Sequence, residues 1–515
     1  MFSRIRSAVC HGIEGRDIFV ETDVARGLPG IYIVGLASTM IMESRERIKS
    51  AILNSGLEYP RGRITVNLTP ASLRKNGSCL DLPIAVGILT SNLCLDPAKS
   101  SDYGIIGELA LDGRVAGVSG ILPMLIRMKE SGIGKVIIPR ENAAEAALVG
   151  GIEIYPVRTL EECVDLISGR TECLPYPSAD LRRKVSELSE TRLIESYDGA
   201  AGDFSDISGQ EMAKRAITVA VTGRHGILMV GSPGCGKTML ASRIPTIMPP
   251  LNEEELLDTS IIYSSAGRNS SGHKLSLLRP FRSPNHTIGR AGLIGGGTYP
   301  VPGEISLAHN GVLFLDEICE FDRECIEALR VPAEEKMITH FRMGESYRFP
   351  CNFQLVMASN PCPCGYYGDS EIACRCTEAQ VERYMKKLSG PMMDRIDIKI
   401  AMQRVTFDEL RQQDKGLSSE EMRRQSAAGI AFAAKCGRPN YNAMMTEQDI
   451  EKYCCLGAEE AAFLERAYNS FKMSPRGYKR TLRVARTIAD LDGSEAIKTS
   501  HLAEALSYRM DDIRE

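Results

Sequence analysis

The chain has 515 residues, which at roughly 150 residues per domain predicts two to four domains. Hydrophobic residues make up 43% and charged residues 25%, the proportions of an ordinary globular protein. The formal net charge of -4 excludes a globally basic surface, so any nucleic-acid site has to be local, such as a lined pore or a loop. The longest apolar runs are far below the ~18 residues of a spanning helix, and the N-terminus lacks the apolar segment of a signal peptide. We therefore expect a cytoplasmic protein with no membrane partner.

The first 170 residues show the pattern of an α/β domain. Residues 63–68 alternate between polar and apolar side chains like a half-buried strand. Residues 105–116 predict a hairpin that turns at Asp112-Gly113, a pair that suits the positive φ angles of a tight turn. A helix, a strand and an alanine-rich helix are then expected, over 121–130, over 135–139 and from 141.

The rest of the chain divides into three segments. Residues 171–202 hold two prolines, a charged stretch and two glycines, which is typical of a linker. Residues 203–401 form a second α/β block. Residues 402–515 have no clear strand pattern and a good helical period around 481–491, which predicts a C-terminal helical domain.

The strongest functional signal is an eight-residue stretch that matches the phosphate-binding loop of nucleotide-binding proteins. A buried-strand run at 226–230 precedes it and a helix-compatible segment at 239–244 follows, as such a loop requires. The glycines let backbone N–H groups face the phosphates, and the helix N-terminus favours an anion. Lys237 would neutralise the β- and γ-phosphates, and Thr238 would hold Mg²⁺. The predicted ATP site comprises Gly231, Ser232, Pro233, Gly234, Cys235, Gly236, Lys237 and Thr238.

Two later strand-like runs end in polar residues. The apolar run 312–315 is followed by Asp316 and Glu317, and a second run ends at Asn360. Ligands of open parallel sheets bind at the carboxyl ends of the strands. Asp316 would bind Mg²⁺ directly or through water, and Glu317 would be the general base that activates the attacking water. Asn360 would position that water near the γ-phosphate.

These three elements, in this order, resemble the AAA+ superfamily of ATPases. Within it, the segment from Gly303 to Glu317 resembles the magnesium-chelatase-like branch, and the chain is identified as a member of the ComM (YifB) family. The supporting motifs are 279–287, the three glycines from Gly295, 389–397 and Ser474-Pro-Arg476. The resemblance covers essentially the whole chain. It implies a central P-loop domain with a parallel sheet, a C-terminal helical lid, and ATP with Mg²⁺ as cofactors.

The resemblance also implies roles for residues that the chain's own pattern does not single out. Arg395 matches the arginine finger, which reaches the γ-phosphate bound by a neighbouring subunit and stabilises charge in the transition state. Arg476 matches the sensor arginine of the helical lid. The segment 203–210, with Ile207, resembles the part that packs on adenine. Because a finger supplied by a neighbour needs assembly, the implied state is a homo-oligomeric, hexameric ring.

Two insertions lie between these elements. Residues 281–303 are rich in glycine, proline and polar residues, and residues 337–349 predict a hairpin that turns at Met343-Gly344. Chelatase-like and MCM-like relatives carry pore-facing insertions at similar places, so these segments hold candidates for contact with the phosphates of a DNA strand. The candidates are Arg290, His340 and Arg342. Ordinary surface loops explain each of these residues equally well.

The chain has 16 cysteines, which without a secretion signal are expected to be reduced thiols or metal ligands rather than disulfides. Two close pairs, Cys362 with Cys364 and Cys374 with Cys376, follow Asn360. Four thiolates suit structural Zn²⁺, but a spacing of one residue within each pair is shorter than the usual two to four. A zinc site and free loop thiols both stay open. A catalytic thiol is disfavoured, because no histidine lies nearby in the sequence.

Residues 102–142 resemble the proteolytic domain of Lon, which uses a serine nucleophile and a lysine base. In the matching register the serine position is Cys79 and the lysine position is Leu122, which cannot take a proton. Ser78 regains the serine position only if the register shifts by one. The resemblance therefore implies a Lon-like fold without protease activity, with a role in assembly or substrate guidance.

The leading hypothesis is a hexameric ATPase that moves DNA, because ComM relatives are associated with helicase-like branch migration during recombination of incoming DNA in competence. A chelatase motor that remodels a partner protein is disfavoured, since chelatase motor subunits lack the N-terminal domain. The missing lysine disfavours an ATP-dependent Lon-like protease. Asp316, Glu317 and Arg395 disfavour a scaffold that scarcely hydrolyses ATP.

Overall fold

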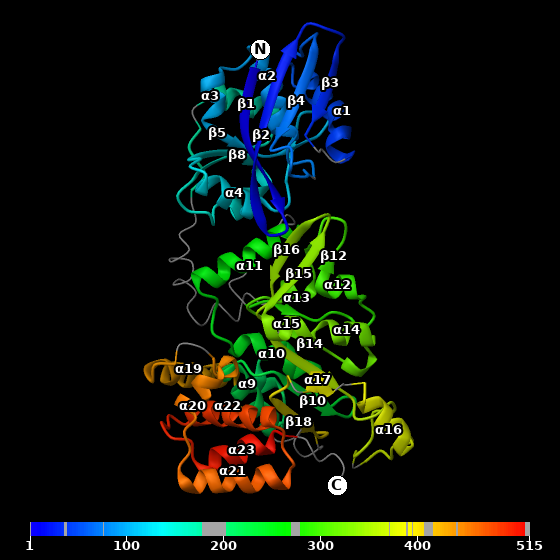
Figure 1. The fold of residues 1–515 in the computed structure, drawn as a ribbon, viewed down its shortest axis with the longest axis vertical. Helices are drawn as coiled ribbons and strands as arrows, with labels where there is room; N and C mark the ends of the chain where they lie inside the picture. The colour runs from blue at the N-terminus through cyan, green and yellow to red at the C-terminus, as the bar shows by residue number, and fades with distance from the viewer. Residues whose placement is uncertain are drawn as a thin grey trace.

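The structure is a computed structural model that describes residues 2–35, 39–75, 77–171, 173–177, 202–268, 279–369, 371–387, 390–393, 395–405, 416–438 and 441–509. Three parts follow one another along the long axis (Figure 1). An N-terminal α/β domain lies at one end, a second α/β domain lies in the middle, and a group of helices lies at the other end. Most of the segment expected to be a linker, residues 178–201, lies outside the described residues.

The N-terminal domain is built on a mixed sheet of seven strands in the order β3-β4-β2-β1-β5-β8-β9. The long β1–β2 hairpin and the β2–β4 pair are antiparallel, and the remaining pairs are parallel. The strands are β1 (Phe2–His11), β2 (Glu14–Ala25), β3 (Gly30–Val34), β4 (Arg63–Thr69), β5 (Tyr103–Ile105), β8 (Lys135–Pro139) and β9 (Glu153–Val157). The helices are α1 (Thr39–Asn54), α2 (Asp81–Ser91), α3 (Pro97–Ser101), α4 (Ile121–Glu130), α5 (Ala143–Ala146) and α6 (Leu160–Ser168).

Several elements of this domain confirm the sequence patterns. The strand expected over 63–68 is β4, and the helix over 121–130 and the strand over 135–139 have the predicted bounds. The predicted hairpin is smaller than expected: β6 (Glu108–Leu109) pairs with β7 (Val115–Ala116), while Ile105 belongs to the main sheet. Gly113 does adopt a positive φ of 86° at the turn. The alanine-rich helix is a short 3-10 turn followed by α5.

The central domain holds a five-stranded sheet in which every pair is parallel, in the order β11-β14-β17-β10-β18. Its strands are β10 (Ile227–Gly231), β11 (Phe281–Arg282), β14 (Val312–Leu315), β17 (Gln354–Ser359) and β18 (Ile398–Met402). Helices α9 (Glu211–Gly223), α10 (Lys237–Ile247), α11 (Glu253–Ser265), α14 (Arg323–Ala328), α15 (Arg330–Glu335), α16 (Glu378–Met385) and α17 (Gly390–Met393) belong to it. Since β17 lies between β10 and β14, the carboxyl ends of these three strands meet at one edge.

The two insertions of the central domain form small elements of their own. The first contains α12 (Arg290–Ile294), the strands β12 (Gly295–Gly296) and β13 (Val301–Pro302), and α13 (Glu304–Leu307). The second is the predicted hairpin, formed by β15 (Met337–Arg342) and β16 (Glu345–Pro350). Met343 and Gly344 both have positive φ, as a two-residue hairpin turn requires.

Two arginines of the 279–287 motif are structural. The Arg279 guanidinium is buried, pairs with both carboxylate oxygens of Glu255 at 2.9 and 3.1 Å, and donates to the carbonyl of Asn310 at 2.7 Å. Arg282 makes a two-pronged pair with Glu304 at 2.6 and 2.8 Å. These pairs fix β11 beside β14 and attach the insertion to the domain.

The C-terminal part is helical throughout its described residues, as expected. Its helices are α19 (Ser419–Lys435), α20 (Glu447–Tyr453), α21 (Ala458–Ser470), α22 (Pro475–Leu491) and α23 (Thr499–Ser507). Helix α22 packs against α9, α19 and α23, so its apolar face joins the core of the central domain. Among the described residues no helix is both long and apolar enough to cross a membrane.

A buried ionic cluster holds this helical part together. The carboxylate of Asp490 is 1% exposed and accepts from Arg486 at 3.0 Å and from Asn442 at 2.7 Å, and it also pairs with Arg438. Burial in apolar surroundings raises the pKa of Asp490, and the facing guanidinium groups act in the opposite direction. Both arginines therefore depend on this one carboxylate for compensation.

Replacing that carboxylate should destabilise the protein strongly. Asp490→Ala leaves two buried guanidinium groups without their counter-charge, and removal of one partner of a buried ion pair costs about 3–5 kcal/mol. Urea unfolding followed by circular dichroism would measure the loss. Glu451→Ala changes an exposed carboxylate of the same helical part and should shift the free energy of unfolding by less than about 0.5 kcal/mol. Equal stability of the two variants would contradict the role of the cluster.

Candidate nucleotide-binding site

The predicted phosphate loop lies between the end of β10 and the start of α10. Gly234 and Gly236 have φ angles of 82° and 91°, a region in which a side chain would be strained. A Cβ on Gly231 would lie 2.6 Å from the carbonyl oxygen of Met402, so the neighbouring strand β18 also requires glycine there. The loop therefore has the strand–loop–helix setting in which backbone N–H groups and a helix N-terminus bind an anion.

Lys237 connects the phosphate loop to the next strand. Its ammonium group is buried and donates to the carbonyls of Gly231 at 2.5 Å and Ser232 at 3.1 Å. It also donates to Oδ1 of Asn360 at 3.2 Å, at the end of β17. The structure thus brings together two site residues that are 123 positions apart in the chain.

The two expected magnesium ligands are in direct contact. The Thr238 hydroxyl donates to Oδ2 of Asp316 at 2.7 Å, and Oδ1 of Asp316 accepts from the N–H of Glu317 at 3.0 Å. A hydroxyl beside a carboxylate is the oxygen donor set that Mg²⁺ uses together with phosphate oxygens, so the residues present fit the ion.

Glu317 lies two residues after the apolar strand β14, and its backbone is strained. Its φ is 50°, which is uncommon for a residue with a side chain and tends to occur at functional sites. Its side chain is exposed, so a water molecule and a nucleotide have access to it. This arrangement suits a general base at the sheet edge.

The three residues suggested by the family resemblance, Arg395, Arg476 and Ile207, differ from one another in exposure and in their partners. Arg395 is 12% exposed and forms an ion pair of 2.5 Å with Glu334, so within one chain this side chain is held by α15. Arg476 is exposed in the first turn of α22. Ile207 is buried, and its carbonyl accepts from the buried ammonium of Lys214 at 2.8 Å.

Two further residues lie beside the phosphate loop: Gln210, at the end of the segment expected to pack on adenine, and Asp369, which the sequence did not single out. The amide of Gln210 donates to the carbonyl of Cys235 at 3.3 Å and to that of Gln403 at 2.6 Å, which ties the loop to the end of β18. Asp369 accepts a hydrogen bond from the Ser232 hydroxyl, and this bond is the first cause that lowers the pKa of its carboxyl to about 2. No sequence signal pairs Asp369 with a serine 137 positions earlier, because only the folded loop brings them together.

The candidates for DNA contact separate into two kinds. The side chains of Arg290, at the start of α12, and Arg342, at the end of β15, are exposed. His340 is half-buried: its Nε2 lies 3.1 Å from the carbonyl oxygen of Ile294 and its ring meets Phe349 edge-on. His340 therefore joins the hairpin to the first insertion, and the two arginines remain accessible.

The four cysteines that follow β17 meet in space. All four Sγ atoms lie within 4.8 Å of one another. The cluster is formed by the segment 361–377, called the cysteine loop below.

The residues that match the Lon nucleophile and base are unsuited to those roles. The Cys79 thiol is 8% exposed, and burial, as the first cause, raises its pKa to about 12. Leu122 is buried in the core. The Ser78 hydroxyl donates to the carboxylate of Glu108. A buried, protonated thiol is a poor nucleophile, and a leucine side chain accepts no proton, so Cys79 and Leu122 do not form a nucleophile–base pair.

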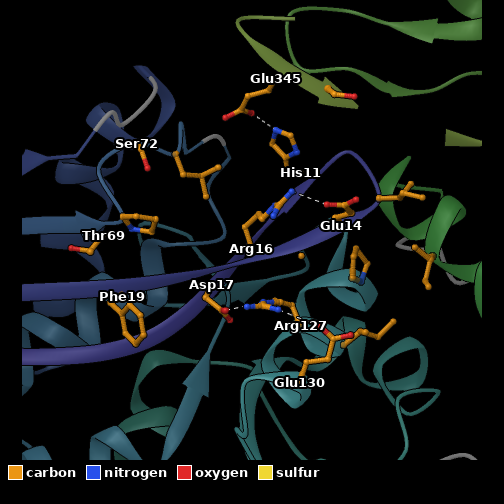
Figure 2. Close-up of a pocket in the computed structure, with 18 of the residues that line it drawn as sticks. His11, Glu14, Arg16, Asp17, Phe19, Thr69, Ser72, Arg127, Glu130 and Glu345 are labelled. Carbon is orange, nitrogen blue, oxygen red and sulfur yellow. Dashed lines mark hydrogen bonds and ion pairs between the residues drawn. The ribbon is translucent and has the colours of Figure 1, made fainter. Parts of the chain in front are cut away.

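A cavity of about 1110 Å³ lies between the N-terminal domain and the β15–β16 hairpin (Figure 2). None of the residues that line it belongs to the phosphate loop. At its edge the His11 ring stacks on Tyr347 with 4.1 Å between ring centroids, and His11 pairs with Glu345. Other charged side chains of the wall are paired with each other: Arg16 with Glu14 and Arg127 with Asp17, both at 2.8 Å. The cavity marks the joint between the two domains.

The central domain combines a phosphate loop after β10, two acids after β14 and Asn360 after β17 on one parallel sheet, and a helical lid follows it. This combination defines the chain as an AAA+ ATPase. A family model described as "Magnesium chelatase, subunit ChlI" matches residues 203–410. Models described as "Subunit ChlI of Mg-chelatase" and "Magnesium chelatase, subunit ChlI C-terminal" match residues 20–142 and 416–509.

The chain belongs to the ComM/YifB family of magnesium-chelatase-like AAA+ proteins. It is 38% identical over 506 residues to "Competence protein ComM" of Haemophilus influenzae, across 98% of this chain and 97% of that protein. It is also 38% identical over 519 residues to "Uncharacterized protein YifB" of Escherichia coli, across 99% and 97% of the two chains. "Lon protease 2" of Bacillus subtilis is 29% identical over 179 residues, which is 31% of this chain and 32% of that protein.

Two substitutions should separate nucleotide binding from hydrolysis. Lys237→Ala removes the ammonium that lies on the loop carbonyls, and we expect loss of measurable binding of a fluorescent ATP analogue. Glu317→Gln should bind the analogue like wild type but hydrolyse ATP at least about 100-fold more slowly, because an amide cannot accept the proton. Glu320→Gln, an exposed carboxylate three positions away, is the matched control and should retain the wild-type rate. Normal turnover by folded Glu317→Gln would refute the base assignment.

Proposed function

We propose that this protein is a ring-forming ATPase that hydrolyses ATP at the phosphate loop and uses the energy to move DNA. The observation that carries the proposal is the contact of Lys237 with Asn360 and of Thr238 with Asp316 at one sheet edge, in a chain similar from end to end to a competence protein. Competence is the uptake of DNA by a cell. Recombination of the incoming DNA with the chromosome needs enzymes that move DNA strands. Lys237 and Thr238 hold the phosphates and Mg²⁺, and Glu317 activates the water.

The β15–β16 hairpin supplies the surface that would contact the strand. Arg342 and Arg348 are exposed on it, and Phe341 and Met343 at its tip are 74% and 57% exposed. Cations that bind phosphates, combined with an aromatic ring on which a base stacks, are the usual elements of single-strand binding. Arg290 of the first insertion adds a further exposed cation. Because the chain as a whole has a net charge of -4, such a local site is the form that DNA binding has to take.

The proposed ring follows from Arg395. In a single chain its guanidinium pairs with Glu334, a carboxylate whose side chain is 54% exposed. In a hexamer, the γ-phosphate bound by the neighbour would replace Glu334 as the partner of this cation. An arginine that reaches the phosphate from a second subunit stabilises charge only in the assembled state, so hydrolysis would depend on the ring. Arg476, on the lid, would report the nucleotide state within its own chain.

A protein-remodelling ATPase is the second candidate. The family models that match the three parts of the chain carry the name of a magnesium chelatase subunit. A motor of that kind acts on a partner protein rather than on DNA. A Lon-like protease is not favoured, because of Cys79 and Leu122.

Mixing two inactive variants would test the shared site. Arg395→Ala should bind ATP normally and hydrolyse it at least about 100-fold more slowly. In mixed rings with Lys237→Ala, some intact phosphate loops face intact arginines, and random mixing would restore about a quarter of the wild-type rate. A mixture of Lys237→Ala with Glu317→Gln is the control: both changes disable the subunit's own loop, so no rate should return. Absence of rescue in the first mixture would refute a finger supplied by a neighbour.

The DNA assignment is tested by the steady-state ATPase rate with single-stranded, duplex and four-way-junction DNA at two salt concentrations. We expect stimulation that weakens as salt rises, because phosphate contacts release counterions, and the strongest effect with the junction. Arg342→Ala should reduce the stimulation while leaving the DNA-free rate unchanged. An active ATPase that is indifferent to every DNA would overturn the proposal and favour the remodelling role.

A further inference from the structure

The four-cysteine cluster has the dimensions of a metal site. The Sγ atom of Cys362 lies 3.4 Å from that of Cys364 and 3.7 Å from that of Cys374, and the latter two are 3.5 Å apart. Four thiolates at 2.3 Å from a tetrahedral Zn²⁺ are separated by about 3.8 Å, so only small shifts would seat the ion. The backbone N–H of Cys376 points at the sulfur of Cys374 at 3.4 Å, the kind of outer contact that steadies a metal-bound thiolate.

Turns and hydrogen bonds, rather than helices or strands, give the described part of the cysteine loop its shape. It spans 361–377, and its described residues contain no helix or strand between the end of β17 and the start of α16. Loops of more than about 12–15 residues without regular structure are uncommon in compact domains, unless they are functional or tied down. A metal ion that joins the two cysteine pairs closes the loop and fixes the point where α16 begins.

The same loop packs directly on the phosphate loop. A Cβ on Gly365 would lie 2.7 Å from Cδ of Pro233, so the two loops are in contact. Asp369 accepts from the Ser232 hydroxyl and from the N–H groups of Glu371 at 3.0 Å and Ile372 at 2.9 Å. The Asp369 side chain is only 2% exposed, with Arg404 at 3.8 Å. This carboxylate therefore links the shape of the cysteine loop to the shape of the phosphate loop.

We propose that the four-cysteine cluster binds one structural Zn²⁺, and that the loop held by this ion braces the phosphate loop in its nucleotide-binding shape. Each thiol gives up its proton to solvent when it binds the metal. The ion has no part in hydrolysis: its effect reaches the nucleotide through Asp369 and Gly365. The bracing role rests on the proposed ATP site, whereas the metal site does not.

Metal content tests the first half of the proposal. The full-length protein, purified in a phosphine reductant without added metal, should contain one zinc per chain by inductively coupled plasma mass spectrometry. Cys374→Ser should lose most of that zinc. Cys455→Ser, at an exposed thiol in the helical part, should keep it. A wild-type protein that carries no zinc, and takes up none in a titration with ZnCl₂ monitored by a competing dye, would overturn the metal site.

Nucleotide affinity tests the second half. Asp369→Ala should keep its zinc and bind a fluorescent ATP analogue about tenfold more weakly, because Ser232 loses its acceptor. Asp369→Asn should restore most of the affinity, since its amide oxygen still accepts from that hydroxyl. Restoration distinguishes bracing from an effect of the negative charge.

Zinc-free Cys374→Ser, checked for folding by circular dichroism, should show the same loss of affinity as Asp369→Ala. Wild-type affinity in this folded, zinc-free variant would overturn the brace. A wild-type protein that contains zinc but binds no nucleotide would overturn the brace together with the proposed function, and would leave the metal site standing.

Discussion

The parallel pairing of β10 with β17 is the constraint on which the rest of the site depends. The register of this pair places Val230 opposite Ser359, so the phosphate loop and Asn360 begin side by side where the two strands end. The pairing of β17 with β14 then adds Asp316 and Glu317 to the same edge. Three segments of sequence separated by long insertions thus form one site. A slip of any strand would separate the ammonium of Lys237 from the amide of Asn360, and the threonine hydroxyl from the aspartate.

Away from this edge, polar contacts connect the central domain to the helical lid and to the N-terminal domain. His225, which precedes β10, has its two ring nitrogens 2.9 Å from Asp397 and 2.8 Å from Thr487, so it joins the sheet to the central helix of the lid. On the opposite side, the β1–β2 hairpin tip stacks on Tyr347, and Ser264 of α11 accepts from the N–H of Gly120 at 2.9 Å. The β15–β16 hairpin therefore contacts the N-terminal domain through Glu345 and Tyr347, close to its turn, while the side chains of Phe341 and Met343 stay largely exposed.

Arg395 and the cysteine loop lie at opposite edges of the central sheet, since Arg395 precedes β18 and the cysteine loop follows β17. The arginine pairs within the chain with Glu334, whose side chain is 54% exposed, and in the proposed ring a neighbour's phosphate would take the place of that carboxylate. The cysteine loop packs against the side of the phosphate loop through Gly365 and Asp369. The proposed ring and the proposed zinc site would therefore act on hydrolysis through separate groups at separate edges of the sheet.

The sequence by itself determined the phosphate loop, the acidic strand, Asn360, the β15–β16 hairpin and the helical lid, because each depends on local spacing: glycines at positive φ, apolar runs, a two-residue turn. Tertiary structure alone decided the order of the strands, the all-buried α2, the long N-terminal hairpin and the pairing of Arg395 with Glu334. It also decided that Asp369 meets Ser232, and it placed within 4.8 Å of one another the four cysteines that the sequence left open as zinc ligands or free thiols. Contacts between residues far apart in the chain depend on how whole elements pack, and no local pattern encodes them.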